Sequence, residues 1–273
     1  MSMPVNYMNE NQAEAAFSRQ SGVFDELYSS NEIIRYKRKR VRDHLLQYLK
    51  PESRILELNA GTGEDAVFFA GLGHYVHATD ISIGMQQKLS EKVKAMNLKE
   101  RVSNERCSFT SLDSLGMKGP YDCIFSNFAG LNCTGNLGVV LDSFDRLLNP
   151  GGIVTLVVLP GFCLWESLLI FKGKFRTATR RFFSSNGRKA KIDQELFTCW
   201  YYYPGYISKK LNKDITLLKV EGLCTVVPPS YIDGFAVKYP RLFAYLCKTE
   251  NRVKTKWPWR YIGDYYIISF RKK

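Results

Sequence analysis

The feature that most constrains the fold is a turn of small residues between an apolar run and a compact helical pattern. The segment "RILELNAGTGEDA" (54–66) carries Glu57 near the end of its apolar run, and Ala60, Gly61 and Gly63 follow within six residues. A strand, a tight turn and a helix in this order form the start of a β-α-β unit. Small residues at such a turn let a ligand approach the backbone and the N-terminus of the helix closely.

The same order of strand and helix continues to about residue 160. Short apolar or alternating segments occur at 54–58, 75–80, 101–108, 121–127 and 153–159. Helical patterns occur before and between them, at 31–50, 64–73, 82–96 and 136–148. This alternation predicts a parallel sheet that is covered by helices on both faces. Further along the chain we expect helices within 161–211, one or two strands within 215–227, a helix at 234–250 and a last strand at 264–272.

Charge is distributed unevenly between the two parts of the chain. Residues 1–159 contain 17 Lys and Arg against 18 Asp and Glu, whereas residues 160–273 contain 22 against 8. The second part also holds 23 of the 37 aromatic residues. A neutral body followed by a basic, aromatic-rich region predicts two regions with different roles.

Cysteine usage and the apolar stretches indicate in which compartment the protein lies and whether it crosses a membrane. The seven cysteines are scattered and form no C-x-x-C pair, which predicts reduced thiols in a cytoplasmic protein without a metal site or disulfides. The apolar stretch 153–171 is interrupted by Pro160, Gly161 and Glu166. We therefore expect it to form two elements of a globular domain instead of one membrane span.

The second predicted strand ends in an acid that suits a ribose. Asp80 lies 17 residues after Gly63, and a carboxylate at that position can accept hydrogen bonds from both hydroxyls of a ribose. Such bonds to a charged group contribute about 1.5–3 kcal/mol each. Nicotinamide dinucleotides and S-adenosylmethionine are both compatible with this pattern.

Four segments resemble one enzyme family. "ELNAGTGEDA", "HATDIS", "YDCIFSN" and "LLNPGGIVTL", in this order over about residues 40–160, are similar to the motifs of the class I, Rossmann-like, S-adenosylmethionine-dependent methyltransferases of small-molecule type. The resemblance implies a seven-stranded, mostly parallel Rossmann-like sheet with helices on both faces and a helical lid inserted after strand 5. It also implies S-adenosylmethionine as cofactor and S-adenosylhomocysteine as product.

The resemblance assigns cofactor contacts residue by residue. Glu57 would serve the methionine amino group, and Asp80 would bind the ribose hydroxyls. Further residues would line the methionine and ribose (Asn59, Ala60, Gly61, Gly63), the adenine (Ile81, Met85, Ser108, Phe109) and the sulfonium (Ser126, Asn127). Asn59 replaces the family's usual first glycine, and Asn is among the residues that tolerate a positive φ. Ser108 and Phe109 occupy the place where the family often has an Asp for the adenine amine, and Asp113 is a distant substitute.

Two carboxylates separate the two cofactor classes. Glu64 and Asp65 lie in the first turn of the helix after the glycines. Negative charge there would repel a pyrophosphate and tolerate a sulfonium and an amine. This argument favours methyl transfer over hydride transfer.

The sequence narrows the acceptor without naming a catalytic residue. "SNFAG" (126–130) lacks the two prolines of the N/D-P-P-F/Y motif with which the family's base methyltransferases clamp an exocyclic amine. The only histidines are His44, His74 and His77, and none lies in 160–260, so we expect structural roles for them. The catalytic residues stay unassigned.

The chain is expected to divide into an N-terminal helical segment over the cofactor site (1–50), a cofactor-binding core (51–160) and a basic lid with the final strands (161–273). Tyr7, Phe17 and Tyr28 are candidates for covering the cofactor. The predicted acceptor is a hydrophobic small molecule or lipid-like metabolite, with or without an anionic group. Its predicted contacts are Arg176, Arg180, Tyr201, Tyr202 and Tyr203.

Alternative readings of the basic region stay open. Cations interleaved with aromatics, as in "FKGKFRTATRRFF" (171–183), also suit RNA or anionic lipid headgroups. An RNA methyltransferase is therefore the alternative enzyme, although no RNA-binding module is recognisable and nucleic acid is the less favoured partner. A catalytically silent cofactor-binding protein is the alternative from another class. Peripheral contact with a membrane also stays open.

Overall fold

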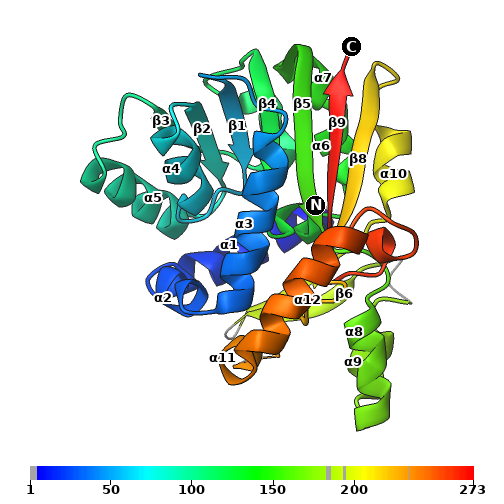
Figure 1. Cartoon of the computed structure of the whole chain (residues 1–273). Coiled ribbons are helices and arrows are strands. Elements are labelled where there is room, and N and C mark those ends of the chain that lie inside the picture. The colour runs from blue at the N-terminus through cyan, green and yellow to red at the C-terminus, as the bar shows by residue number, and fades with distance from the viewer. Residues whose placement is uncertain (1–4, 183–185, 193–194, 233) are drawn as a thin grey trace.

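The computed structural model covers the chain and describes all residues except 1–4, 183–185, 193–194 and 233. Its main sheet has seven strands in the order β3-β2-β1-β4-β5-β9-β8 (Figure 1). The strands are β1 (Arg54–Leu58), β2 (Tyr75–Asp80), β3 (Val102–Arg106), β4 (Tyr121–Ser126), β5 (Leu148–Val158), β8 (Ile215–Leu223) and β9 (Tyr265–Lys272). β9 runs in the opposite direction to the other six strands of this sheet. The predicted seven-stranded, mostly parallel sheet is confirmed.

Two apolar cores cover the two faces of the sheet. Along β1, Ile55 packs into one core, whereas Leu56 and Leu58 pack into the other. The first core is closed by α3 (Glu32–Leu46), α4 (Glu64–Gly71) and α5 (Ile83–Ala95), and the second by α6 (Leu137–Asp142), α7 (Phe144–Leu147) and α10 (Pro204–Lys210). The single helix expected at 136–148 is thus two short helices. Ser143 lies between them and its hydroxyl donates to the carbonyl of Val140, a local bond that competes with a continuous helix.

The insertion between β5 and β8 is only partly helical. It begins with α8 (Leu164–Ser167), η3 (Leu168–Lys172) and α9 (Phe175–Thr179), but a two-stranded antiparallel sheet follows, β6 (Arg188–Ile192) and β7 (Glu195–Cys199). The expectation of helices throughout 161–211 is therefore wrong for this hairpin. In β7 the buried Phe197 and Cys199 alternate with more accessible residues, as in a strand with one covered face.

The hairpin is covered by the N-terminal helix α1 (Val5–Gln20). The side chain of Asn9 accepts a hydrogen bond from the amide of Thr198 (2.5 Å) and donates to its carbonyl (3.1 Å). Long-range packing of this kind decides between helix and strand where local propensity is ambiguous. Together, α1 and β7 cover part of the edge of the main sheet where the ligand site lies.

The remaining helical elements are α2 (Phe24–Ser29), η1 (Phe109–Ser114), η2 (Gly130–Cys133), α11 (Phe235–Lys238), α12 (Pro240–Val253) and η4 (Trp259–Tyr261). Figure 1 shows α1, α2, α11 and α8–α9 together at one end of the sheet. Among the described residues, no helix is both long enough and apolar enough to cross a membrane.

Candidate functional site

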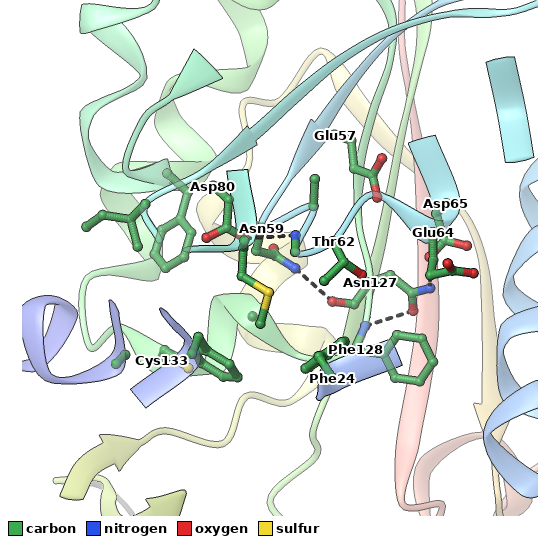
Figure 2. A pocket seen from close by; sticks show the side chains of 18 of the residues that line it. Phe24, Glu57, Asn59, Thr62, Glu64, Asp65, Asp80, Asn127, Phe128 and Cys133 are labelled. Carbon is green, nitrogen blue, oxygen red and sulfur yellow. Dashed lines mark hydrogen bonds between the residues drawn. The ribbon is translucent and has the colours of Figure 1, made fainter. Parts of the chain in front are cut away.

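A cavity lies at the carboxyl ends of β1, β2 and β4, where the strand order reverses on either side of β1 (Figure 2). This is the position at which open parallel sheets bind ligands. All but two of the predicted cofactor residues line it: Glu57, Asn59, Ala60, Gly61, Asp80, Ile81, Met85, Ser108, Phe109 and Asn127. The other two, Gly63 and Ser126, lie behind the wall, where they support residues that line the cavity.

The turn after β1 has the left-handed backbone that its glycines suggested. Asn59, Gly61 and Gly63 have φ values of 49°, 56° and 81°. A Cβ on Gly61 would meet nothing closer than the sulfur of Met85 at 4.0 Å, so this position leaves the cavity open. A Cβ on Gly63 would lie 2.7 Å from Cγ of Leu89, so Gly63 is required for packing against α5 instead of for contact with a ligand.

Asn59 links the ends of two strands. Its Nδ2 donates to the carbonyl of Asn127 (2.9 Å), and its Oδ1 accepts from the hydroxyl of Ser126 (2.6 Å). An amide side chain at the usual glycine position therefore adds a bridge between β1 and β4 that glycine would lack.

Asp80 is held by backbone amides. Its two carboxylate oxygens accept hydrogen bonds from Gly61 N and Ser82 N, both at 2.9 Å. Burial raises the pKa of Asp80, and these two hydrogen bonds oppose the shift. Each oxygen keeps a further lone pair, so the carboxylate can accept from the hydroxyls of a bound ribose.

Glu57 is a buried carboxylate with an unused oxygen. The residue is 3% exposed and lines the cavity, and its Oε2 is buried without a hydrogen-bond partner among the described residues. Burial raises the pKa of Glu57 well above its usual range, and the negative charge of Asp65 raises it further. An ammonium group in the cavity would satisfy this oxygen and reverse both effects.

Asp65 is neutralised by two arginines of α3. Arg38 Nη1 and Arg42 Nε approach its carboxylate to 2.8 and 2.6 Å, and Asn127 Nδ2 donates to it at 2.8 Å. Burial alone would raise the pKa of Asp65, but the two arginines outweigh it and lower the pKa. The predicted repulsion of a pyrophosphate by Asp65 is consequently weaker than the sequence suggested.

The loop after β4 carries a residue that the motif comparison did not assign. Phe128 lines the cavity, and the guanidinium of Arg38 lies 4.8 Å from the centroid of its ring. Phe128 and Ala129 both have positive φ values, 49° and 60°, which non-glycine residues adopt at a cost. Neither residue type signals this conformation, so the sequence could not reveal it.

A second unassigned residue comes from α1. Glu10 is buried and lines the cavity, and it accepts hydrogen bonds from Ser108 Oγ (2.6 Å) and Thr110 Oγ1 (2.9 Å). Asp113, the distant substitute, is 79% exposed and pairs with Arg146. The N-terminal helix therefore brings a carboxylate to Ser108, after β3, where the local sequence has none. Glu10 lies almost a hundred residues from Ser108 in the sequence, and no local sequence pattern indicates that the two residues are in contact.

None of the predicted acceptor residues lines the cavity. Arg176 is exposed on α9, and Arg180 pairs with the buried Glu166. Tyr201 packs under Arg181, Tyr202 is buried and donates to the carbonyl of Thr134, and Tyr203 is largely exposed. These residues follow strand 5 in the sequence, but that position does not determine where the insertion folds.

The three histidines contact residues of the protein body. His44 is fully buried, with Nε2 2.8 Å from the hydroxyl of Ser269. His77 bonds Ser103 through Nδ1 (2.8 Å), and His74 is buried beside Phe69. None of the three lines the cavity.

The N-terminal residues that we expected over the cofactor divide into three cases. Phe17 lines the cavity. Tyr28 lines a neighbouring hollow that shares Phe24, Arg38 and Glu64 with it. The side chain of Tyr7 lies outside the described residues.

Comparison with known proteins identifies the core. Residues 55–152 match the family model of a methyltransferase domain. A comparison with curated protein sequences gives no match. Many solved structures share the fold.

The 1,6-didemethyltoxoflavin-N1-methyltransferase of Burkholderia thailandensis, solved with 1,6-didemethyltoxoflavin and S-adenosylhomocysteine, is 16% identical with a TM-score of 0.59; the match covers 100% of this chain and 92% of that chain. The [4+2]-cyclase SpnF is 15% identical with a TM-score of 0.55, and the match covers 85% of this chain and 80% of that chain. Phospholethanolamine N-methyltransferase 2 of Haemonchus contortus is 17% identical with a TM-score of 0.55, and the match covers 86% of this chain and 52% of that chain.

Proposed function

We propose that this chain is a class I S-adenosylmethionine-dependent methyltransferase and that it methylates a hydrophobic small molecule or lipid-like metabolite; the match of its core to a methyltransferase domain and its fold support this. S-adenosylmethionine supplies a methyl group activated by a sulfonium. Such a transfer requires in-line placement of a nucleophile, and placement of that kind can provide about 7–11 kcal/mol of the barrier. The residues of the chain therefore have to bind the cofactor and the acceptor, align the two, and exclude water from the reacting atoms.

The cavity fits the cofactor. Glu57 Oε2, a buried acceptor without a partner, suits the amino group of the methionine part, and the amide-held carboxylate of Asp80 suits the ribose. The apolar side chains of Ile81, Met85 and Phe109 suit the faces of an adenine. Hydrogen bonds from charged groups would fix both ends of the molecule.

We propose Glu10 as the acceptor for the exocyclic amine of the adenine. Its carboxylate is already fixed by Ser108 and Thr110 at the end of the cavity beside Phe109. An inosine analogue presents a carbonyl at this position, which a carboxylate disfavours. We expect Glu10→Ala to reduce the preference for S-adenosylhomocysteine over S-inosylhomocysteine by about tenfold, the value of one charged hydrogen bond. An unchanged preference in calorimetric titrations would remove Glu10 from the adenine site.

The observation that carries the acceptor proposal is the apolar character of the wall opposite the glycine turn. This wall is formed by Ala13 and Phe17 of α1, Phe24 of α2, and Phe128 and Cys133 after β4. Figure 2 shows Phe24 and Phe128 close together beneath Asn127. A wall of this kind binds apolar surface and keeps water from the reacting atoms. In this scheme residues 1–50 cover the site, 51–160 bind the cofactor, and 161–273 complete the sheet and form the basic region.

The charge of the cavity argues against an anionic acceptor. Carboxylates of Glu10, Glu57, Glu64, Asp65 and Asp80 line it. The described lining contains one cation, Arg38, which is paired with Asp65. Arg38 and Arg42 compensate Asp65, Lys92 compensates Glu64, and burial favours the neutral form of Glu57. The described lining nevertheless offers no unpaired cation to the phosphates of RNA or to an anionic group on a small molecule. A neutral or cationic apolar acceptor is the class that these charges favour.

The proposal is tested by supplying radiolabelled S-adenosylmethionine together with extracts of lipids and apolar metabolites, and separately with total RNA. Label that partitions into organic solvent supports it. Label in RNA supports the alternative enzyme and contradicts the acceptor class. Tight binding of S-adenosylhomocysteine without transfer to any pool favours a binding protein or other chemistry, an alternative raised by the name of SpnF, a cyclase with this fold.

A further inference from the structure

The insertion after β5 forms a projection with exposed aromatic residues. We define the α8–α9 knob as residues 164–182, and Figure 1 shows it extending away from the sheet at the end where α1 and α2 lie. Phe171 is 84% exposed and Phe175 is 61% exposed. Three further apolar side chains of the knob are exposed: Leu168, Ile170 and Phe182. Exposed apolar residues that cluster in this way mark an interaction surface.

Cations alternate with these aromatics at the tip. Residues 171–176, "FKGKFR", are all exposed and carry Lys172, Lys174 and Arg176. No ion pair involves these three cations in the part of the chain that the structure describes. The sequence contains no acidic residue from 167 to 192. The tip therefore combines apolar surface with uncompensated positive charge.

The base of the knob is anchored in the protein body. Glu166 is buried and accepts from Arg180 Nε (2.8 Å) and Arg181 Nη2 (2.5 Å). Arg181 also donates to Asp264 Oδ1 at 2.8 Å, just before β9. Cys163 lies in the same cluster, but the two arginines occupy the carboxylates that a metal ion would need. This buried network holds the knob in a fixed direction.

A second surface of the same character lies on α11 and α12, at the same end of the molecule in Figure 1. Its exposed apolar or aromatic residues are Val237, Tyr239, Leu242 and Tyr245, and the exposed Trp257 follows just after α12. Its exposed cations are Lys238, Arg241, Lys248 and Arg252. The only acid of α12, Glu250, is buried and accepts hydrogen bonds from the amides of residues 224–227.

We propose that the α8–α9 knob, supported by α11 and α12, docks the protein on a membrane that contains anionic phospholipids. The tip is convex, and a bilayer adapts to a convex surface. Its aromatics can enter the boundary between headgroups and acyl chains while its cations remain at the phosphates. RNA would match the cations and aromatics but not the exposed aliphatic residues Leu168, Ile170 and Leu242. Docking through this end would direct the cavity towards the lipid surface, and it does not depend on the proposed acceptor.

The test is sedimentation of the full chain with vesicles of phosphatidylcholine alone or mixed with phosphatidylserine, at low and physiological ionic strength. We expect binding to the anionic vesicles that weakens as salt rises. Phe171→Ser with Phe175→Ser should lower the partition coefficient by about tenfold or more at both ionic strengths, because apolar insertion is not screened. Lys172→Gln with Lys174→Gln and Arg176→Gln should reduce the preference for phosphatidylserine several-fold, because the cations of α11 and α12 remain.

A matched control separates docking from general surface hydrophobicity. Val139 on α6 and Leu217 on β8 are also about half exposed, and their joint change to Ser should leave vesicle binding intact. Retained binding of S-adenosylhomocysteine and unchanged melting would show that each variant is folded. Absence of binding by the unmodified chain, or an equal loss in the control, would overturn the proposal. So would self-association without vesicles that the two Phe→Ser changes abolish, because the tip would then be a contact between copies.

Discussion

Replacing Glu57 by Gln is expected to change the stability of the free protein and its affinity for cofactor in opposite directions. In the free protein, burial and the charge of Asp65 raise the pKa of Glu57 above its usual range, because Oε2 has no partner. The folded state then retains a proton that the unfolded state has lost. The free energy of unfolding therefore falls as pH rises from the usual pKa of a Glu through the raised one. Gln has the same shape and does not titrate.

The change in stability and the change in cofactor affinity each have an expected size. Gln carries no charge, so replacing the buried carboxylate removes the cost of its ionisation and should stabilise the free protein by about 1–3 kcal/mol near neutral pH. This corresponds to roughly 2–4 °C in melting temperature for each kcal/mol in a domain of this size. The same change removes a charged hydrogen bond to the amino group of the cofactor, worth about 1.5–3 kcal/mol, or roughly 10- to 150-fold in affinity.

The assay is thermal unfolding across pH combined with calorimetric titration of S-adenosylhomocysteine. Glu64→Gln is the matched control, because Glu64 also lines the cavity but is more exposed and pairs with Lys92. We expect the control to change affinity by less than about threefold. A Glu57→Gln protein that melts at a lower temperature, or that binds S-adenosylhomocysteine as tightly as the unmodified chain, would refute the reasoning.

Three further changes test the site and its support. Asp80→Asn should weaken binding of S-adenosylhomocysteine by about tenfold or more in calorimetry, whereas Asp113→Asn on the surface should not change it. Arg181→Met should lower the free energy of chemical unfolding by about 3–5 kcal/mol, because the buried Asp264 loses its arginine and Glu166 keeps only Arg180, with cofactor affinity unchanged in the folded protein. Gly130→Ala would place a Cβ 2.2 Å from Cγ of Asn59 and should weaken cofactor binding, while Gly205→Ala, which meets nothing within 4 Å, should bind normally.

The core of the fold follows from the sequence because its determinants are local. Each strand up to β5 is a short apolar or alternating segment followed by a turn or a helix, so the order of strands and helices predicts a parallel sheet. The positive φ values of Gly61 and Gly63 were predictable from residue type, and that of Asn59 was acceptable for the same reason. Residues at the ends of successive parallel strands must meet at one edge, which is why Glu57, Asp80 and the neighbours of each converge.

The parts that escaped prediction depend on contacts distant in the sequence. Glu10 reaches Ser108 from α1, and the hairpin of β6 and β7 is covered by that same helix. The basic residues of 171–181 suggested a substrate anchor, but Arg180 and Arg181 neutralise a buried acid, and the others face outward. A run of cations shows only that charge is present. Which acid it meets, or whether it meets any, is decided by tertiary structure.

The N-terminal helix connects the two halves of the proposed reaction. Glu10, Ala13 and Phe17 are spaced so that they share one face of α1, and all three line the cavity. Glu10 faces the predicted adenine position, whereas Ala13 and Phe17 belong to the proposed apolar wall. Because a helix moves as a unit, a cofactor that binds Glu10 also positions the wall against which the acceptor must pack. On the proposed function, a change that displaced α1 would therefore weaken both the binding of the adenine by Glu10 and the packing of the acceptor against the wall.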